Sequence, residues 1–331
     1  MKKLRSKIHG KKTRVPAGVI GLGLMGTSIV ACLLAAGHRV VAVTRNPAKH
    51  KGARRGVLNL LQQMKAEGFL KTSPPALLKR LSITEDFSEL RDCGVVIESI
   101  IEEIGAKKDC FRRIEVSVSP DTVIGTNTSA IPVTLLQEGM AHPERMLGIH
   151  WAEPAHITRF LEVIAGDRTG PVYAERVLAL ARAWGKEPTF VRRDIRGFIT
   201  NRLMYAMLRE AFSLVENGYA TPEDVDRSVR NDMGWWMTLA GPFRYMDLTG
   251  IPAYEAVMRD LLPDLCNGKS VPRLMSEIVE SGARGVANCK GFYSYTPSQA
   301  RRWEKTFLEF TFDVRRLALK YSEAAGSRKR S

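Results

Sequence analysis

The chain has 331 residues, of which 44% are hydrophobic, enough to build one large or two medium-sized globular domains. Its formal net charge of +15 is concentrated at the ends, where residues 1–14 hold seven Lys or Arg and residues 328–330 hold three more. The modest charge of the remainder argues against a nucleic-acid-binding protein. We expect residues 1–14 to form a disordered basic arm and residues 323–331 a basic tail.

Five cysteines, an odd number without CxxC spacing, are typical of a reducing compartment and give no sign of a metal site. Residues 17–37 carry no charge and follow the basic arm, so they imitate a membrane span. Five glycines lie within this stretch, and a strand-like run, 39–43, follows at once. This pattern instead predicts a strand, a glycine turn and a helix, and therefore a cytoplasmic protein that does not cross a membrane.

The glycine turn has the GxGxxG spacing and lies between a predicted strand, 15–20, and an apolar helix that ends near Gly37. Gly21 permits the tight turn, Gly23 lets a pyrophosphate approach the backbone, and Gly26 allows close packing of helix on strand. The N-terminus of the helix offers unpaired N–H groups to the phosphates. The residues of this turn that we predict to bind a dinucleotide are Gly21, Gly23, Leu24, Met25 and Gly26.

The second strand, 39–43, should end beside the adenosine ribose of the dinucleotide. NAD enzymes place an Asp or Glu there, which would repel a 2′-phosphate. This chain has Thr44 followed by Arg45. A hydroxyl group and a guanidinium suit a phosphate, which Arg can bind through two hydrogen bonds. The sequence therefore predicts a preference for NADP(H) over NAD(H); the alternative is that Arg45 stacks on adenine and both cofactors bind.

Two helices, at about 49–68 and 72–80, follow the second strand and make this crossover longer than an ordinary one. Strands and helices then alternate, which predicts an α/β Rossmann domain, with a helical insertion, over residues 15–195. The further predicted strands are 81–83, 95–100, 122–125, 146–149, 160–164 and 188–191, and the further predicted helices are 106–116 and 172–184.

From residue 196 the pattern becomes helical. Apolar residues from Ile199 to Val215 form one face of a long helix, and those from Trp303 to Tyr321 recur at steps of three and four residues. Such stripes usually form the core, and at the end of a helical domain they also suit a dimer interface. We predict an all-α domain over residues 196–322.

A histidine and a carboxylate occupy two apolar runs of the first domain. His150 ends the run 146–149, and Glu162 lies inside the run 160–164. A buried carboxylate is costly without a partner, and His150 is the nearest one if the two runs lie side by side. The pair would make His150 a better base, whereas the alternative is a packed core histidine and an unrelated glutamate. Ser129 follows the predicted strand 122–125, at the end where open α/β sheets bind ligands.

Over residues 15–322 the chain resembles the L-3-hydroxyacyl-CoA dehydrogenase family. The resemblance implies a Rossmann domain followed by an all-α dimerisation domain, similar to the C-terminal domain of 6-phosphogluconate dehydrogenase. It also implies a homodimeric NAD(P)-dependent oxidoreductase of fatty-acid metabolism. The motifs that carry it are GLGLMG from Gly21, ESIIEE from Glu98, NTSAIP from Asn127, GIHWAEP from Gly148, LEVI from Leu161, GFITNRL from Gly197, GPF at 241–243 and KGFYSY from Lys290.

The family's site residues can be carried over to matching positions. The resemblance implies that His150 is the catalytic base and acid and that Glu162 orients it. It also implies that Ser129 and Asn201 hydrogen-bond the reacting oxygen of the substrate. The residues that it places around the cofactor are Glu102 and Lys107, near the nicotinamide ribose, and Asn127.

One departure from the family pattern concerns the substrate. The family's HFFNP is replaced here by His150-Trp-Ala-Glu-Pro154, so that Glu153 stands where an Asn helps to fix the substrate. Asn donates and accepts hydrogen bonds, whereas an ionised Glu only accepts them and adds a negative charge. We therefore expect Glu153, with Ser129 and Asn201, to select the substrate.

The sequence predicts the interconversion of an L-3-hydroxyacyl-CoA, or a related 3-hydroxy acid, and its 3-keto form. Alternatives are a substrate without CoA, such as carnitine or gulonate, and a non-catalytic NADP-binding regulator. The 3-hydroxyisobutyrate-type dehydrogenases share the glycine turn, but their GxxGxGxxxNxxK motif does not occur here.

Overall fold

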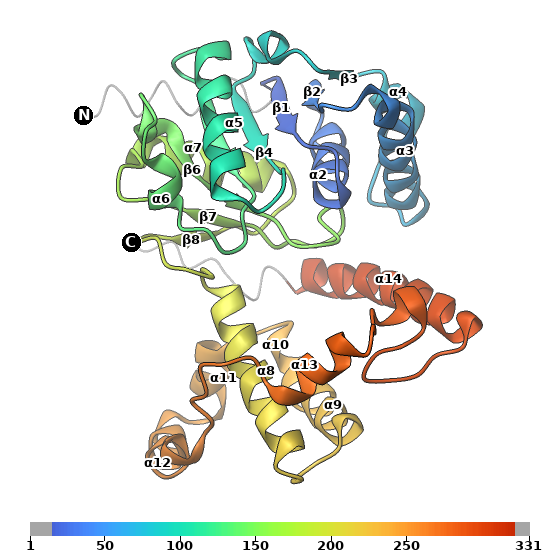
Figure 1. Cartoon of the computed structure of the whole chain (residues 1–331), viewed down its shortest axis with the longest axis vertical. Helices are drawn as coiled ribbons and strands as arrows, with labels where there is room; N and C mark the ends of the chain where they lie inside the picture. The colour runs from blue at the N-terminus through green and yellow to red at the C-terminus, as the bar shows by residue number, and fades with distance from the viewer. Residues whose placement is uncertain (1–14, 322–331) are drawn as a thin grey trace. The chain divides into compact units, whose positions relative to one another are not determined.

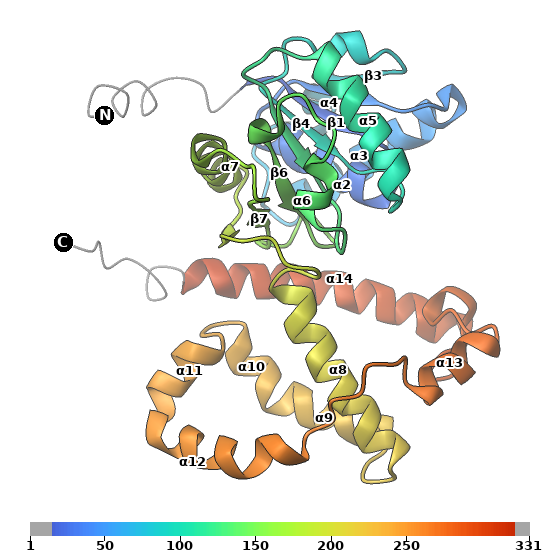
Figure 2. The same ribbon diagram turned by 60° about the vertical axis from the view of Figure 1, so that its left-hand side comes forward.

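The computed structural model describes residues 15–321, so the predicted arm and tail lie outside the described residues. The chain divides into two compact units, with the boundary between Asn201 and Arg202, a few residues after the predicted one (Figures 1 and 2). Among the described residues, no helix combines the length and the apolar character that a membrane span requires.

Within the described part of the first unit there is one sheet of eight short strands: β1 (Ala17–Ile20), β2 (Val40–Val43), β3 (Leu81–Thr84), β4 (Val95–Glu98), β5 (Val123–Thr126), β6 (Met146–His150), β7 (Glu162–Ile164) and β8 (Thr189–Val191). Their order is β3-β2-β1-β4-β5-β6-β7-β8. Strands β1 to β6 are parallel, β7 runs antiparallel to β6, and β8 runs parallel to β7. The strand order reverses between β1 and β4, where doubly wound sheets bind their ligands.

Helices cover both faces of this sheet, which makes three layers (Figure 1). One face packs against α2, α3, α4 and α7, and the other against η2, α5 and α6. Because side chains alternate along a strand, Val19 belongs to the first core and Ile20 to the second. The helical elements are α2 (Leu24–Ala35), η1 (Pro47–Lys49), α3 (His50–Ala66), α4 (Pro74–Leu78), η2 (Phe87–Leu90), α5 (Ile104–Ser117), α6 (Val133–Gln137), η3 (Pro143–Arg145) and α7 (Pro171–Ala183).

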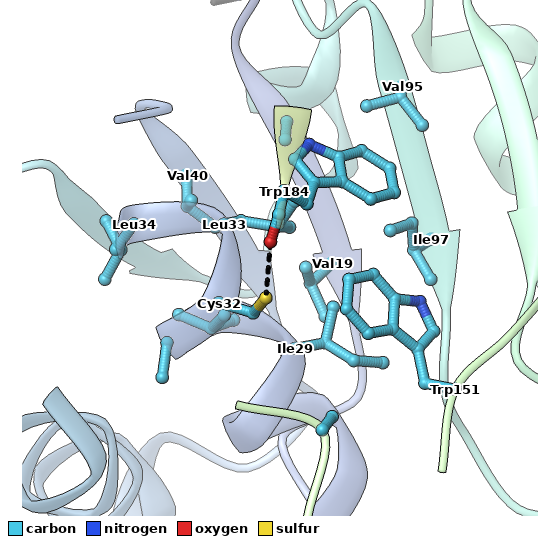
Figure 3. Close-up of a cluster of buried hydrophobic side chains, with 14 of the residues drawn as sticks. Val19, Ile29, Cys32, Leu33, Leu34, Val40, Val95, Ile97, Trp151 and Trp184 are labelled. Carbon is cyan, nitrogen blue, oxygen red and sulfur yellow. Dashed lines mark hydrogen bonds between the residues drawn. The ribbon is translucent and has the colours of Figure 1, made fainter. Parts of the chain in front are cut away.

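The uncharged stretch that imitates a membrane span is β1, the glycine turn and α2. All four residues of β1 are buried, and α2 is buried on most of its surface (Figure 3). A helix buried on all sides is apolar all round. The absence of charge therefore reflects a central position in the domain. The helical insertion after β2 is also present, as α3 and α4.

The second unit is helical, as predicted. Two of its helices start at threonine N-caps: the Thr221 side chain accepts a hydrogen bond from the N–H of Asp224, and Thr296 forms a capping box with Gln299. Its elements are α8 (Thr200–Glu216), α9 (Pro222–Asn231), α10 (Met233–Met237), α11 (Pro242–Thr249), α12 (Ile251–Leu261), η4 (Leu262–Asp264), α13 (Arg273–Glu280), η5 (Val286–Asn288) and α14 (Pro297–Lys320).

Candidate active site

A cleft of about 890 Å³ runs along the carboxyl ends of β2, β1, β4 and β5. Its lining follows the strand order, so the glycine turn after β1 lies in the middle. Thr44 and Arg45 line it after β2, and Glu102 and Ser129 line it after β4 and β5. This volume is in the range of ligand pockets. The predicted dinucleotide-binding residues that line it are Gly21, Gly23, Leu24, Met25, Thr44, Arg45, Glu102 and Asn127.

The glycine turn fits a pyrophosphate. Gly21 has φ +93°, and a Cβ there would lie 2.4 Å from the Ser99 carbonyl oxygen. A Cβ on Gly26 would lie 1.9 Å from the Gly21 oxygen, whereas one on Gly23 would meet no atom within 4 Å. A side chain at Gly21 or Gly26 would therefore collide with the backbone, whereas Gly23 faces space that a ligand can enter. No side chain caps the start of α2, and its first turn holds no acid, so its amides can bind phosphate.

The end of the cleft beside β2 carries two cationic side chains. Arg45 lines it as expected, and Arg113 of α5, which the sequence did not single out, joins it. The guanidinium of Arg113 lies 3.9 Å from the centre of the Phe87 ring, a cation–π contact that restrains it. This end of the cleft suits a phosphate or an adenine ring.

His150 and Glu162 face each other across the antiparallel pair β6 and β7. His150 Nδ1 lies 2.9 Å from Glu162 Oε2, and both residues are buried. Glu162 Oε1 accepts hydrogen bonds from the N–H groups of Ile199 and Thr200, both at 3.1 Å. Burial alone would raise the pKa of Glu162, but the hydrogen bonds from His150, Thr200 and Ile199 together hold that pKa below its ordinary value. Glu162 is therefore an ionised acceptor for His150.

Ser129 completes a chain of polar contacts. Because Glu162 accepts the Nδ1 proton, the lone pair of His150 Nε2 points the other way, toward Ser129 Oγ at 3.2 Å. The side-chain amide of Asn201 donates to the Ser129 carbonyl oxygen at 3.0 Å. The structure thus brings together the four residues that the sequence predicts to be catalytic, with Ser129 also lining the cleft.

The lowered pKa of Glu162 predicts an acid-dependent loss of stability. A carboxylate whose pKa is lower in the folded chain than in the unfolded chain stabilises the fold at pH values above its unfolded-state pKa, near 4.5. This stabilisation is lost as the pH falls through the folded-state pKa. Denaturant unfolding should therefore show a free-energy difference between wild type and Glu162→Gln that shrinks below about pH 4.5. A pH-independent difference for Glu162→Gln would contradict the prediction.

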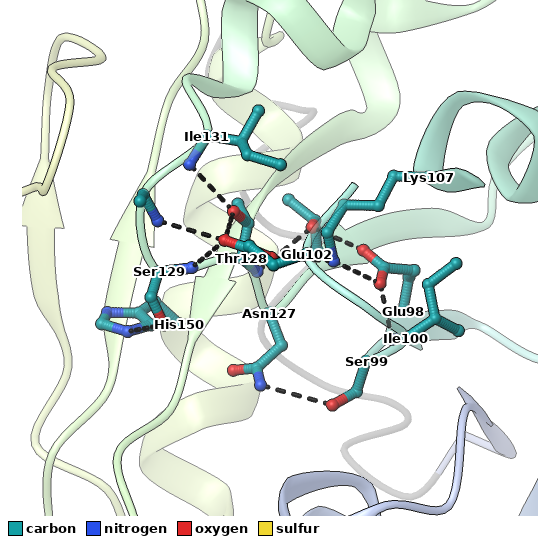
Figure 4. A network of polar contacts seen from close by, with 12 residues as sticks. Glu98, Ser99, Ile100, Glu102, Lys107, Asn127, Thr128, Ser129, Ile131 and His150 are labelled. Carbon is teal, nitrogen blue, oxygen red and sulfur yellow. Dashed lines mark hydrogen bonds and ion pairs between the residues drawn. The ribbon is translucent and has the colours of Figure 1, made fainter. Parts of the chain in front are cut away.

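The loops after β4 and β5 form a polar network beside His150 (Figure 4). Asn127 Oδ1 accepts the N–H of Trp151 at 2.9 Å, which joins the ends of β5 and β6. Lys107, which the resemblance places near the nicotinamide ribose, is 1% exposed and is not among the residues that line the cleft. The reason is Glu98, a fully buried carboxylate that holds the Lys107 ammonium at 2.6 Å.

Glu153 is the departure from the family pattern, and its side chain is only partly exposed. It does not line the cleft. Partial burial raises the pKa of its carboxyl group, while a hydrogen bond from the N–H of Ala155 acts in the opposite direction. Buried Lys186, which the sequence did not reveal, donates from Nζ to the carbonyl oxygens of Ala155 and Thr158, each at 2.5 Å. These hydrogen bonds from Lys186 therefore hold the loop that carries Glu153 in place.

A doubly wound sheet with an open glycine turn, and a buried His–carboxylate pair that reaches the cleft through Ser129, defines a dinucleotide-dependent dehydrogenase. Family models agree with this class. Residues 16–195 match the NAD-binding domain of 3-hydroxyacyl-CoA dehydrogenase, and residues 197–295 match its C-terminal domain. The chain belongs to the 3-hydroxyacyl-CoA dehydrogenase family, and it is an oxidoreductase that uses a nicotinamide dinucleotide and acts on CH–OH groups.

Two curated relatives illustrate the range of this family. A 5-formyl-3-hydroxy-2-methylpyridine 4-carboxylate 5-dehydrogenase of Mesorhizobium japonicum is 35% identical over 90% of this chain and 96% of its own. A probable 3-hydroxybutyryl-CoA dehydrogenase of Deinococcus radiodurans is 31% identical over 84% of this chain and 99% of its own. A crystal structure of the former activity, described as an NAD⁺-dependent dismutase, superposes with a TM-score of 0.85 at 33% identity and covers 92% of this chain and 98% of its own.

Proposed function

We propose that the protein interconverts an L-3-hydroxyacyl-CoA, or a related 3-hydroxy acid, and its 3-keto form. The observation that carries this proposal is the contact chain Glu162–His150–Ser129, whose last member lines the dinucleotide cleft. A bound dinucleotide supplies the acceptor for a hydride. The chain itself supplies the acid and base, which an alcohol needs when it loses a hydride and a proton.

We propose a role for each of these side chains, which the contacts support. His150 Nε2 takes the hydroxyl proton in oxidation and returns it in reduction. Glu162 keeps Nδ1 protonated and stabilises the imidazolium. Ser129 and Asn201 hydrogen-bond the oxygen that is hydroxyl in one state and carbonyl in the other. In support, Ser129 Oγ lies 3.2 Å from His150 Nε2, so one oxygen can reach both groups.

A substrate panel tests this function. Turnover of acetoacetyl-CoA with NADH or NADPH, followed at 340 nm, is expected to exceed that of dehydrocarnitine and of the 3-keto acid of gulonate. A clear preference for one of the substrates without CoA would identify that compound, and not an acyl-CoA, as the substrate class. Cofactor binding without turnover across the panel would instead favour a regulator.

A second candidate substrate is a carboxylated aromatic aldehyde or alcohol. It is favoured by the relative at 35% identity, which matches the chain over 90% of its length. Burial raises the pKa of Cys110, a cysteine of the cleft, to about 12, so that this thiol is not a nucleophile for an aldehyde. Oxidation would therefore rely on His150 activating a hydroxyl group or a hydrated aldehyde. Adding the pyridine aldehyde named for that relative to the panel separates the two candidates.

We also propose a preference for NADP(H). Thr44 stands where NAD enzymes place an acid, and Arg45 and Arg113 both line that end of the cleft. Hydrogen bonds between charged groups contribute about 1.5–3 kcal/mol. Arg45→Ala should accordingly lower kcat/KM for NADPH by ~10- to 100-fold and change that for NADH little. Exposed Arg55→Ala, which lies outside the cleft lining, is the matched control; an equal loss with both cofactors, or a wild-type preference for NADH, would refute the proposal.

We also propose that the protein forms a homodimer through its second unit. Among the described residues after 201, the buried apolar side chains are Ala300 and Phe312, too few for a helical domain of this size. Trp303, Phe307 and Phe310 of α14 are each more than half exposed. A second copy that covers these residues would supply the missing core, and light scattering of the purified protein is expected to give twice the mass of one chain. The five unpaired cysteines support a cytoplasmic location.

A further inference from the structure

Phe198 has a backbone conformation that phenylalanine rarely adopts. Its φ is +51°, in the left-handed region, where a bulky side chain crowds the backbone. Residues held in this region cluster at functional sites, because the surrounding structure must offset the strain. Phe198 is also fully buried, in the core on the second face of the sheet. Glycine would adopt this φ without strain, so the buried ring and the left-handed backbone are two separate requirements of this position.

The backbone that follows Phe198 is directed at Glu162. The N–H groups of Ile199 and Thr200 both donate to Glu162 Oε1, each at 3.1 Å, and Thr200 then begins α8. The N–H of Phe198 itself donates elsewhere, to the Ile195 carbonyl oxygen at 3.0 Å. The change of direction between these N–H groups takes place at Phe198, where φ is positive. The left-handed conformation of Phe198 therefore brings two successive donors onto one carboxylate oxygen.

The ring of Phe198 packs against the partner of that carboxylate. Its centre lies 5.4 Å from the centre of the His150 ring, and Phe160 packs perpendicular to the same imidazole at 5.5 Å. The two nitrogens of the imidazole face Glu162 and Ser129. Polar contacts and aromatic contacts thus hold His150 together, and the residue is 5% exposed.

We propose that Phe198 is a positioning residue for the base. Its backbone directs two N–H donors at Glu162, and its ring holds His150 beside that carboxylate. Burial raises the pKa of Glu162, and the contacts that lower this pKa come from His150, Thr200 and Ile199. N–H donors that face Glu162 disfavour a proton on the coupled pair, whichever member carries it.

The kinetic consequence rests on the proposed function, in which His150 exchanges a proton with the substrate. If the two N–H donors turn away, the pair binds a proton more readily, so that the unprotonated base is lost at a higher pH. The imidazole is also less well aligned, which lowers kcat.

The test compares two isomeric replacements, Phe198→Leu and Phe198→Ile. Both lose the aromatic ring and have equal numbers of atoms, but the branched Cβ of isoleucine is less compatible with a positive φ. The acidic limb of kcat/KM for oxidation should stay close to the wild-type pH with Phe198→Leu and lie about one pH unit higher with Phe198→Ile. The kcat of Phe198→Ile should be ~10- to 100-fold below that of Phe198→Leu.

Hydrogen exchange of the Ile199 and Thr200 amides, followed by NMR, needs no turnover. Both amides should be protected in the wild type and in Phe198→Leu, and should exchange faster in Phe198→Ile. The matched control is Phe111, a fully buried phenylalanine inside helix α5. Phe111→Leu and Phe111→Ile should share one acidic limb and one level of protection of these amides.

An acidic limb or an amide protection that is the same in Phe198→Leu and Phe198→Ile would overturn the inference. A difference of equal size between the two Phe111 variants would overturn it as well, because the effect would then come from core packing. Absence of turnover by the wild type with every substrate would count against the proposed function instead. The amide exchange would still decide the positioning role.

If Phe198→Ile does not fold, Phe198→Gly and Phe198→Ala replace the pair. Both lose the ring, and glycine alone adopts φ +51° without strain. Phe198→Ala is expected to have the lower Tm, the acidic limb at higher pH and the faster exchange of the two amides. A Tm of Phe198→Ala equal to or above that of Phe198→Gly would overturn the inference.

Discussion

Replacing His150 by Gln is expected to lower kcat by ~10²–10⁴, because the chain then lacks the group that exchanges a proton with the substrate. Glutamine has nearly the reach of histidine and can still donate to Glu162, so the carboxylate that lies 2.9 Å away keeps a partner. The fold should be preserved, and the Kd for NADH should stay close to that of the wild type, since His150 does not line the cleft.

The control for this change is His142→Gln, an exposed histidine that contacts Glu144 at the surface. Its kcat should equal that of the wild type. The measurements are steady-state turnover with the best substrate of the panel and NADH binding by fluorescence. Activity that survives His150→Gln would remove His150 from the mechanism.

Replacing Gly26 by Ala is expected to abolish dinucleotide binding. A Cβ at this position would lie 1.9 Å from the backbone oxygen of Gly21, so that the glycine turn and the start of α2 must separate. A backbone atom cannot rotate away as a side chain can, and the shift would reach the amides that bind phosphate. Calorimetric titration with NADH should show loss of binding, and the Tm should fall.

Gly23→Ala is the informative comparison. A Cβ there meets no atom of the chain within 4 Å and φ is −74°, so the fold should tolerate it. The same methyl group would stand where a pyrophosphate approaches, and the Kd for NADH should rise with an unchanged Tm. Normal NADH binding by both variants would exclude this turn as the phosphate site.

Much of the fold follows from patterns that local physics dictates. The apolar run Val95–Ile97 is a strand buried on both faces, and the glycine turn could lie only between a strand and a helix. The contact between His150 and Glu162 was predictable for a different reason. A carboxylate inside an apolar strand needs a partner, and few polar side chains were placed to provide one.

Glu98 ends the apolar run Val95–Ile97, so the sequence also indicates a buried carboxylate there. The sequence does not indicate which residue is the partner of Glu98. Lys107 lies on the following helix, and its contact with Glu98 depends on how α5 packs against the sheet. The Arg113–Phe87 contact and the Lys186 contacts depend likewise on the packing of separate elements, which residue spacing along the chain does not reveal.

The reversal of direction between β6 and β7 makes the pairing of the base with its partner independent of the loop that joins the two strands. The register of the two strands, with His150 opposite Glu162, fixes the base and its partner. The intervening residues, 151–161, form an excursion whose composition does not set that register, because the strands on either side do. Substitutions within this excursion are therefore expected to leave the pairing of His150 with Glu162 in place.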